Sequence, residues 1–180
     1  MAFKRLGIEG FGVVELNNVA FRRDGRIEAQ CKLDEEVFAD KVVENGMILA
    51  VDNTKRAYHL PTGEDPLLVL IYSAEHLDQQ LGVQLNKYKN TVGNYLPRGG
   101  YLAKGDKITT NTLGYDDGEY TDDDALLEAI GTGAVYGKVG AEGVIELTAT
   151  KPEKGLTFIA TKAYTMPDGT PGVQLQVIAD

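Results

Sequence analysis

Short apolar runs separated by turn residues constrain the fold of this chain more than any other feature of its sequence. Leu67–Tyr72 is a continuous apolar run with the length of a buried strand, and Met47–Val51 is a second one. Later runs of strand type are separated by Gly, Pro, Asn and Asp residues. They are Lys107–Leu113, Ala134–Val139, Val144–Thr150, Leu156–Met166 and Val173–Ile178. The pattern predicts a mainly β fold, in the form of a small β-sandwich or β-barrel-like body.

Helical periodicity is confined to two stretches. Asp122–Ile130 begins with three aspartates, which suit the positive end of a helix dipole, and Thr121 stands in the position of an N-cap. Ser73–Lys89 has leucines at helical spacing, although Gly82 weakens the pattern. The sequence therefore predicts one or two short helices beside the strands.

The length of 180 residues fits one domain, or one domain with an extension. Residues 1–42 contain short, broken strand-like pieces with weak apolar periodicity, whereas the signals strengthen from Val43 onward. We therefore expect an N-terminal arm or hairpin over residues 1–42 and a β-rich body over residues 43–180. An arm of this kind gains little from a core of its own, so we expect it to contact a neighbouring subunit.

The chain is poor in the residues that active sites use. It has one Ser, one Cys, two His and no Trp. His59 and His76 form no recognisable catalytic spacing, and a zinc site needs three or four ligands. The sequence therefore predicts a protein that is not an enzyme, with no catalytic residue, no cofactor and no metal site. A lone cysteine forms no intrachain disulfide, and the alternation around Cys31 predicts a buried side chain on a strand.

The formal charge of -9 disfavours a nucleic-acid partner, because acidic excess repels phosphate backbones. No apolar run reaches the length of a membrane span, so we expect no membrane partner. The first residues have no apolar segment of the kind that a secretory signal contains, so we expect synthesis in a cytoplasm.

Basic residues gather near the start of an otherwise acidic chain. We treat these as possible assembly contacts, which would dock on an acidic surface of a neighbour. They are Lys4, Arg5, Arg22, Arg23 and Arg26. The alternative is that these side chains lie on solvated faces of strands, where isolated charges contribute little.

Two further patterns leave other functions open. The acidic stretch Asp116–Asp124 departs from a calcium-binding loop, because Tyr115 and Leu113 stand where acids are required. A solvated loop before a capped helix explains the stretch better, and whether it binds a cation stays open.

A small-ligand or carbohydrate-binding module is an alternative function, because aromatic rings near this loop would form a stacking platform. The rings are those of Tyr95, Tyr101, Tyr115 and Tyr120. An enzyme with a pair of carboxylates, as in glycosidases, is a further alternative.

Several segments resemble structural proteins of tailed bacteriophages. Asn45–Asp52, followed by Lys55–Pro61, resembles a β element of phage head decoration proteins. Leu96–Arg98 with Leu102–Thr110 is similar to a segment of small phage structural proteins, and Gly133–Ile178 is similar in style. The resemblance implies a virion protein, assembled in the cytoplasm of the host bacterium, with no catalytic residues.

Within that class, a capsid decoration or stabilising subunit is the first expectation. Its partners would be the major capsid protein or other virion proteins, and we expect a homo-oligomer, with a trimer as the working number of subunits. A component of the neck, the tail or a head fibre is the alternative within the same class.

Overall fold

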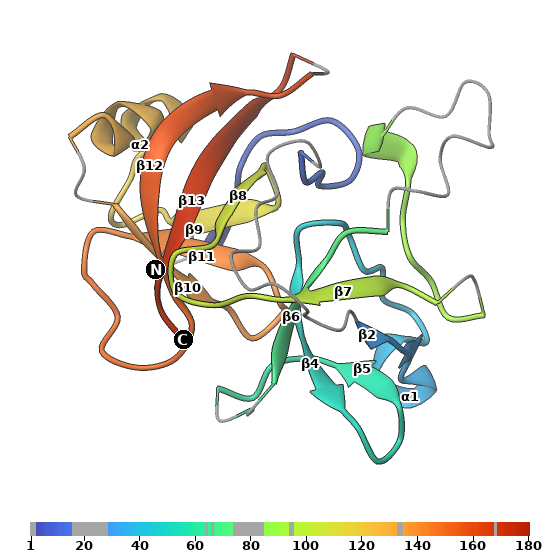
Figure 1. Cartoon of the computed structure of the whole chain (residues 1–180). Helices are drawn as coiled ribbons and strands as arrows, with labels where there is room; N and C mark the ends of the chain where they lie inside the picture. The colour runs from blue at the N-terminus through green and yellow to red at the C-terminus, as the bar shows by residue number, and fades with distance from the viewer. Residues whose placement is uncertain are drawn as a thin grey trace.

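The computed structural model describes residues 3–15, 29–63, 65, 67–73, 85–93, 96–132, 135–167 and 169–180. Over these residues the fold is mainly β, with two sheets and two short α-helices, as the sequence predicts. Figure 1 shows the two sheets side by side, with helix α2 against the first sheet and helix α1 against the second.

The first sheet has seven strands in the order β1-β9-β11-β10-β12-β13-β8. The strands are β1 (Phe3–Arg5), β8 (Lys107–Thr110), β9 (Leu113–Asp116), β10 (Tyr136–Val139), β11 (Ile145–Thr148), β12 (Thr157–Thr165) and β13 (Pro171–Ala179). β8 and β9 lie toward opposite ends of this order, yet only Asn111 and Thr112 separate them in the chain. The sheet must therefore curl strongly, in the manner of a barrel.

The second sheet has six strands in the order β2-β7-β6-β4-β5-β3. They are β2 (Ala29–Gln30), β3 (Lys32–Leu33), β4 (Ile48–Asp52), β5 (Ala57–His59), β6 (Leu68–Ile71) and β7 (Arg98–Tyr101). β4 and β6 pair in the centre, with Ile48 opposite Leu70. These two strands come from the two continuous apolar runs of the sequence, which is typical of strands that are covered on both faces.

Two apolar cores lie on the two faces of this central pair. Ile48 and Leu70 join the core beneath the first sheet, whereas their chain neighbours Leu49 and Val69 join the second core. Side chains of α2 (Asp123–Ile130) close the first core, and Phe38 of α1 (Glu35–Phe38) belongs to the second. Because successive side chains of a strand point to opposite faces, β4 and β6 contribute to both cores.

The predicted strands are confirmed with shifts at their ends, except that Lys107–Leu113 is two strands rather than one. Thr110, Asn111 and Thr112 bind other segments there, which breaks the ladder. The predicted helix Asp122–Ile130 is confirmed, but its N-cap is Asp122 and not Thr121, because the Asp122 carboxylate accepts the Ala125 N–H at 2.8 Å. In Ser73–Lys89, residues 74–84 lie outside the described residues, and Leu85–Lys87 is a 3-10 turn, η3.

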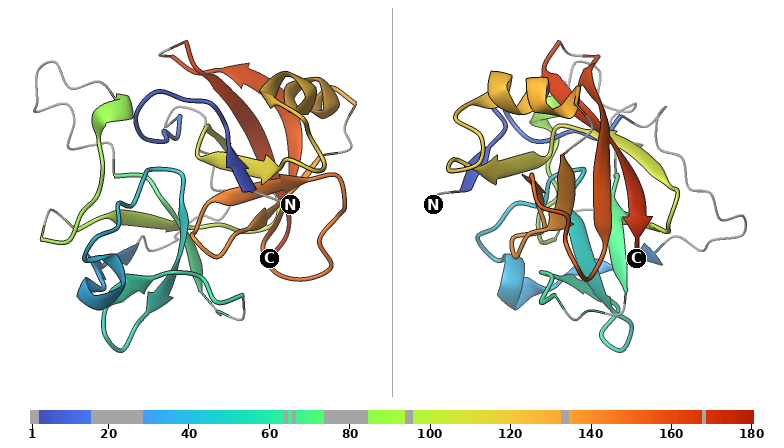
Figure 2. Two further views of the ribbon diagram at one scale, coloured as in Figure 1. Left: turned by 180° about the vertical axis from the view of Figure 1, so that it is seen from behind. Right: turned by 90° about the vertical axis from the view of Figure 1, so that its left-hand side faces the viewer.

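The described parts of the predicted N-terminal arm are packed into the body. Residues 3–15, which we call the N-terminal strap, pair with β9 through β1 and with Thr110 of β8 through Val14. Leu6 and Val14 are buried in the first core, so the expectation that residues 1–42 gain little from a core of their own is wrong for the strap. The strap is anchored by single buried residues, which produce no periodic apolar pattern in the sequence. Figure 2 shows the strap in dark blue against the first sheet.

Candidate functional site

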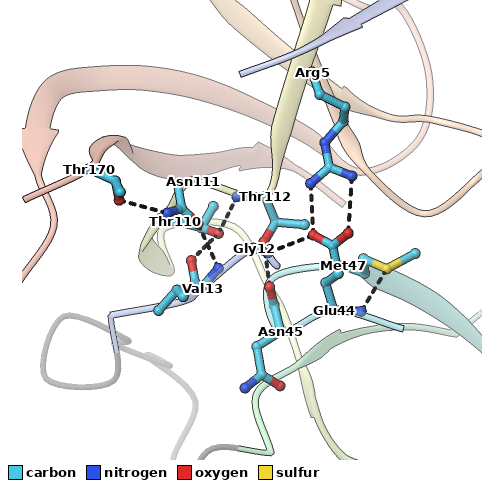
Figure 3. Close-up of polar contacts among 10 residues, drawn as sticks. All are labelled: Arg5, Gly12, Val13, Glu44, Asn45, Met47, Thr110, Asn111, Thr112 and Thr170. Atoms are coloured by element: carbon cyan, nitrogen blue, oxygen red, sulfur yellow. Dashed lines mark hydrogen bonds and ion pairs between the residues drawn. The ribbon is translucent and has the colours of Figure 1, made fainter. Parts of the chain in front are cut away.

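A dense cluster of polar contacts lies where three remote segments cross (Figure 3). The N-terminal strap, the turn before β4 and the break between β8 and β9 meet there. We call this cluster the polar junction; it consists of Arg5, Gly12, Val13, Glu44, Asn45, Met47, Thr110, Asn111, Thr112 and Thr170.

The Glu44 carboxylate holds the strap at two places. Its Oε2 accepts from Nη2 of Arg5 at 2.8 Å and from the N–H of Gly12 at 2.7 Å, and its Oε1 accepts from Nη1 of Arg5 at 3.4 Å. The Glu44 side chain is 16% exposed and that of Arg5 is 36% exposed. A two-point guanidinium–carboxylate pair in partial shelter from water is among the stronger polar contacts of proteins.

The break between β8 and β9 binds the strap with its side chains. Thr110 Oγ1 donates to the Val13 carbonyl at 2.8 Å, and Asn111 Oδ1 accepts from the Val13 N–H at 2.6 Å. The Thr112 hydroxyl donates to the carbonyl of Asn45. Asn111 Nδ2 donates to Thr170 Oγ1 at 3.0 Å. The donors and acceptors of these residues therefore bind the chain itself, in a region where Thr110, Asn111 and Thr112 are fully buried.

Two glycines allow the segments to approach this closely. A Cβ at Gly12 would overlap the Thr112 hydroxyl, and a Cβ at Gly46 would overlap the hydroxyls of Thr110 and Thr112. Gly46 also has φ +93°, a conformation that favours glycine. The junction is thus a tight crossing of backbones, fastened by hydrogen bonds.

The predicted assembly residues fall into two groups. Arg22, Arg23 and Arg26 lie outside the described residues. Arg5 is bound to Glu44, and Lys4 is exposed, with its Nζ 5.5 Å from the centre of the Tyr115 ring. A hydrogen bond to Tyr115 raises the pKa of Lys4. Both described cations therefore help to hold β1 against its own subunit, and Lys4 is the more exposed of the two.

Carboxylates of the acidic stretch Asp116–Asp124 also bind other segments of the same chain. Asp123 accepts from the Tyr115 hydroxyl at 2.6 Å and from the N–H of Gly7 at 2.8 Å. Glu119 accepts from Thr148 Oγ1 at 3.0 Å and from the N–H of Ala149 at 2.8 Å. In the part of the chain that the structure describes, no three His, Cys, Asp or Glu side chains are placed to hold a metal ion. These carboxylates tie the strap and the end of β11 to α2 and its preceding loop.

Tyr115 and Tyr120 do not belong to the surface platform expected for a carbohydrate-binding module. Tyr115 and Tyr120 are buried and pack edge to face, with ring centres 6.1 Å apart and planes at 79°. Tyr101 is half-buried on β7 of the other sheet, and Tyr95 lies outside the described residues. Rings inside the core offer no face for a sugar, because core packing covers both sides of each ring.

The remaining residues singled out in the sequence lie apart from one another. Cys31 is buried, as predicted, although it stands between β2 and β3 rather than within a strand; burial raises the pKa of its thiol. His59 is half-buried on β5, with Nδ1 3.0 Å from the carbonyl oxygen of Leu60. His76 lies outside the described residues.

Surface grooves of about 420, 250 and 170 Å³ lie over the described residues, and charged side chains line each of them. The first has Lys32, Asp34 and Glu35 in its wall. The second has Arg5 and Glu44 above an apolar floor that includes Phe38. Charges in these walls form ion pairs with each other, such as Lys32 with Glu35 and Arg5 with Glu44. We therefore interpret the grooves as surface depressions between neighbouring elements and not as ligand sites.

Apart from Arg5, which was expected to contact a neighbour, sequence reasoning missed the residues of the polar junction. It treated the threonines of Lys107–Leu113 as members of a pleated surface. The usable signal was Asn111, because an asparagine in the middle of a strand is unfavourable unless its side chain binds backbone groups. Glu44 carried no signal, since nothing in the sequence places it beside Arg5.

Comparison with protein-family models, with curated proteins and with solved structures finds no match for this chain. Among the helices that the structure describes, none has the length and apolar character needed to cross a lipid bilayer.

Proposed function

We propose that this chain is a non-enzymatic virion structural protein, a decoration or stabilising subunit that binds the capsid lattice of a tailed bacteriophage and associates with copies of itself. The observation that carries the proposal is the polar junction. There, side chains of the kinds that enzymes direct at substrates bind backbone groups of the same chain instead.

A subunit that stabilises a shell has to keep its shape while it is held at several points. Local unfolding begins where few buried contacts hold a segment, and chain ends are the usual place. In this protein the strap is held by Glu44 at Gly12 and by Asn111 at Val13, and both bonds lie in or near the core. The junction therefore supports a role in which rigidity, rather than opening and closing, is required.

The sequence resemblance supports the virion class. Residues 45–61 form β4, β5 and the turn that leads into them, so the stretch that resembles head decoration proteins is a folded hairpin of the second sheet. The described strap is packed into the body, so we expect capsid contacts to come from exposed surfaces rather than from a detached arm over residues 3–15.

The proposal is tested on particles of the phage that encodes the chain. Density-gradient fractions of heads, tails and whole particles are probed with an antiserum against the purified protein, and heads made without the chain are heated beside complete heads. We expect the chain in the heads, and DNA release at lower temperature when it is absent. Presence in tails or fibres would favour the neck, tail or fibre alternative, and absence from all particles would overturn the virion role.

A further inference from the structure

The outer edge of β1 is an open sheet edge within the described part of the chain. β1 is the terminal strand of the first sheet and pairs with β9 on one side only. The Leu6 N–H donates to the Leu113 carbonyl at 3.0 Å, which fixes the phase of the antiparallel ladder. By the alternation of such ladders, Lys4 directs its N–H and C=O toward β9, and Phe3 and Arg5 direct theirs away from it.

The side chains of β1 leave this edge accessible. Phe3 is 47% exposed, and its ring lies over Gly114, where a Cβ would overlap it. Arg5 shares the face of Phe3, and Glu44 of its own subunit binds its guanidinium. The right-hand view of Figure 2 shows β1 at the margin of the molecule.

Lysine at an edge strand normally prevents pairing with another chain, because its charge cannot be buried. Lys4 does not act in this way here. Its ammonium lies over the Tyr115 ring on the other face of β1, in a field to which Asp123 and Asp122 contribute. Both cations of the strand are thus compensated within one subunit, and this lowers the electrostatic cost of bringing two copies of β1 together.

We propose that the outer edge of β1 pairs with β1 of a second copy, antiparallel, about a two-fold axis between the two Lys4 residues. In this register Phe3 lies opposite Arg5 of the partner subunit, and each such pair exchanges both backbone hydrogen bonds. A register that places Phe3 opposite the partner's Phe3 uses fewer of the outward groups of Phe3 and Arg5. One that places Arg5 opposite the partner's Arg5 sets Phe3 against the partner's Gly7, whose N–H already donates to Asp123 of its own subunit.

The Lys4-centred register also sets the Phe3 ring beside a guanidinium of the partner, which adds a cation–π contact. A three-residue strand buries far less than the roughly 1,200–2,000 Å² of a stable complex, so the contact is weak in dilute solution and strengthens at high local concentration. A trimer has no two-fold axis, so in a trimeric protein this contact would join separate oligomers. The contact does not depend on the proposed virion role.

Disulfide trapping of the full chain tests the register. Lys4→Cys is chosen because the proposed register sets residue 4 directly opposite residue 4 of the partner, with Cα atoms about 4.5 Å apart, within disulfide range. The background is Cys31→Ala, so that the introduced thiol is the one that reacts. We expect mild oxidation to give a covalent dimer that reductant reverses. The matched control is Lys162→Cys in the same background, an exposed lysine on β12 that reports random collisions. Equal rates of dimer formation for the two variants would overturn the proposal.

A second variant tests the backbone bonds without a cysteine. Phe3→Pro removes an N–H that points outward, so the pairing of β1 with β9 is retained while each copy loses one donor at the interface. In sedimentation velocity over a concentration series, we expect the association constant to fall by about tenfold or more, because the two-fold axis removes the donor twice. Phe3→Ala, which keeps the N–H, should weaken association less. A wild type that is monomeric throughout the series, or association that Phe3→Pro leaves unchanged, would overturn the proposal.

Discussion

Asn111 and Val13 bind each other through two hydrogen bonds although 98 positions separate them in the chain. The Asn111 side-chain oxygen accepts from the Val13 N–H at 2.6 Å, and the Asn111 N–H donates to the Val13 carbonyl at 3.1 Å. Asn111 thus extends the hydrogen bonding between the strap and β8 one residue beyond the end of β8, and it helps to join the strap to the first sheet.

Asn111→Ala should destabilise the protein by about 1–3 kcal/mol, because it leaves the buried Val13 N–H without an acceptor. Urea unfolding followed by circular dichroism measures the loss. Asn53→Ala, at an exposed asparagine in the β4–β5 turn, is the control and should change the free energy of unfolding by about 0.5 kcal/mol or less. Equal effects of the two substitutions would show that the junction does not hold the strap.

The pair of Arg5 and Glu44 should contribute more than an exposed pair of the same length. A double-mutant cycle to alanine should give a coupling of about 1 kcal/mol or more, since Glu44 is largely sheltered from water. The chain contains its own comparison in Lys41 and Glu142, which lie 2.9 Å apart, against 2.8 Å for Arg5 and Glu44, but are 45% and 70% exposed. That cycle should give about 0–0.5 kcal/mol, and a larger coupling there than at Arg5 would refute the reasoning.

Gly46→Ala should cost several kcal/mol, because backbone strain adds to the overlap with the buried hydroxyls of Thr110 and Thr112. Gly155→Ala isolates the strain, since Gly155 has φ +77° and open space around it. Its cost should be about 1 kcal/mol. The difference between the two midpoints of thermal unfolding measures how tightly the segments cross at the junction, and similar midpoints would mean that the crossing can relax.

Alkaline pH should weaken the fold through Tyr58. Burial raises the pKa of Tyr58, whose hydroxyl donates to the Pro97 carbonyl at 3.0 Å. A raised pKa in the folded state means that the stability is fully present below the ordinary value of 10.0 and is lost as pH rises beyond it toward the folded-state value. Tyr58→Phe should therefore reduce the loss of unfolding free energy between neutral pH and pH above 10.0.

The control for this measurement is Tyr164→Phe, at a half-buried tyrosine on β12. The two variants carry the same number of tyrosines, so any difference in their alkaline sensitivity arises from position 58. An unchanged alkaline loss in Tyr58→Phe would assign the effect to other groups.

The sequence predicts the strands of the two cores well, because a continuous apolar run marks β6 and an alternating one marks β13. Leu67–Tyr72 gives β6 and Val173–Ile178 lies within β13, where alternate side chains enter the core. Such patterns depend on neighbours along the chain, and a single sequence displays them directly.

The candidate site was not predictable in the same way. The bonds of Glu44 to Arg5 and Gly12 span 39 and 32 positions, and the chain shows no local sign of either. The strap was misread as an arm, because it is held by isolated residues such as Leu6 and by polar bonds, which produce no repeating pattern. Tyr115 was misread as a surface ring because the loop after it is acidic, whereas the residue itself points into the core.

The position of the strap has a consequence for the order of events during synthesis. Residues 3–15 leave the ribosome well before Asn111 and strand β9, their partners in the fold, which are made about a hundred residues later. At bacterial and eukaryotic elongation rates that interval is roughly 5–20 s. Throughout it, Leu6 and Val14 have no core to enter, and Phe3 and its neighbours are as available to the same segment of another nascent chain as to their own sheet. Chains translated side by side on one messenger therefore expose this segment to one another before β9, its partner in the same chain, has been made.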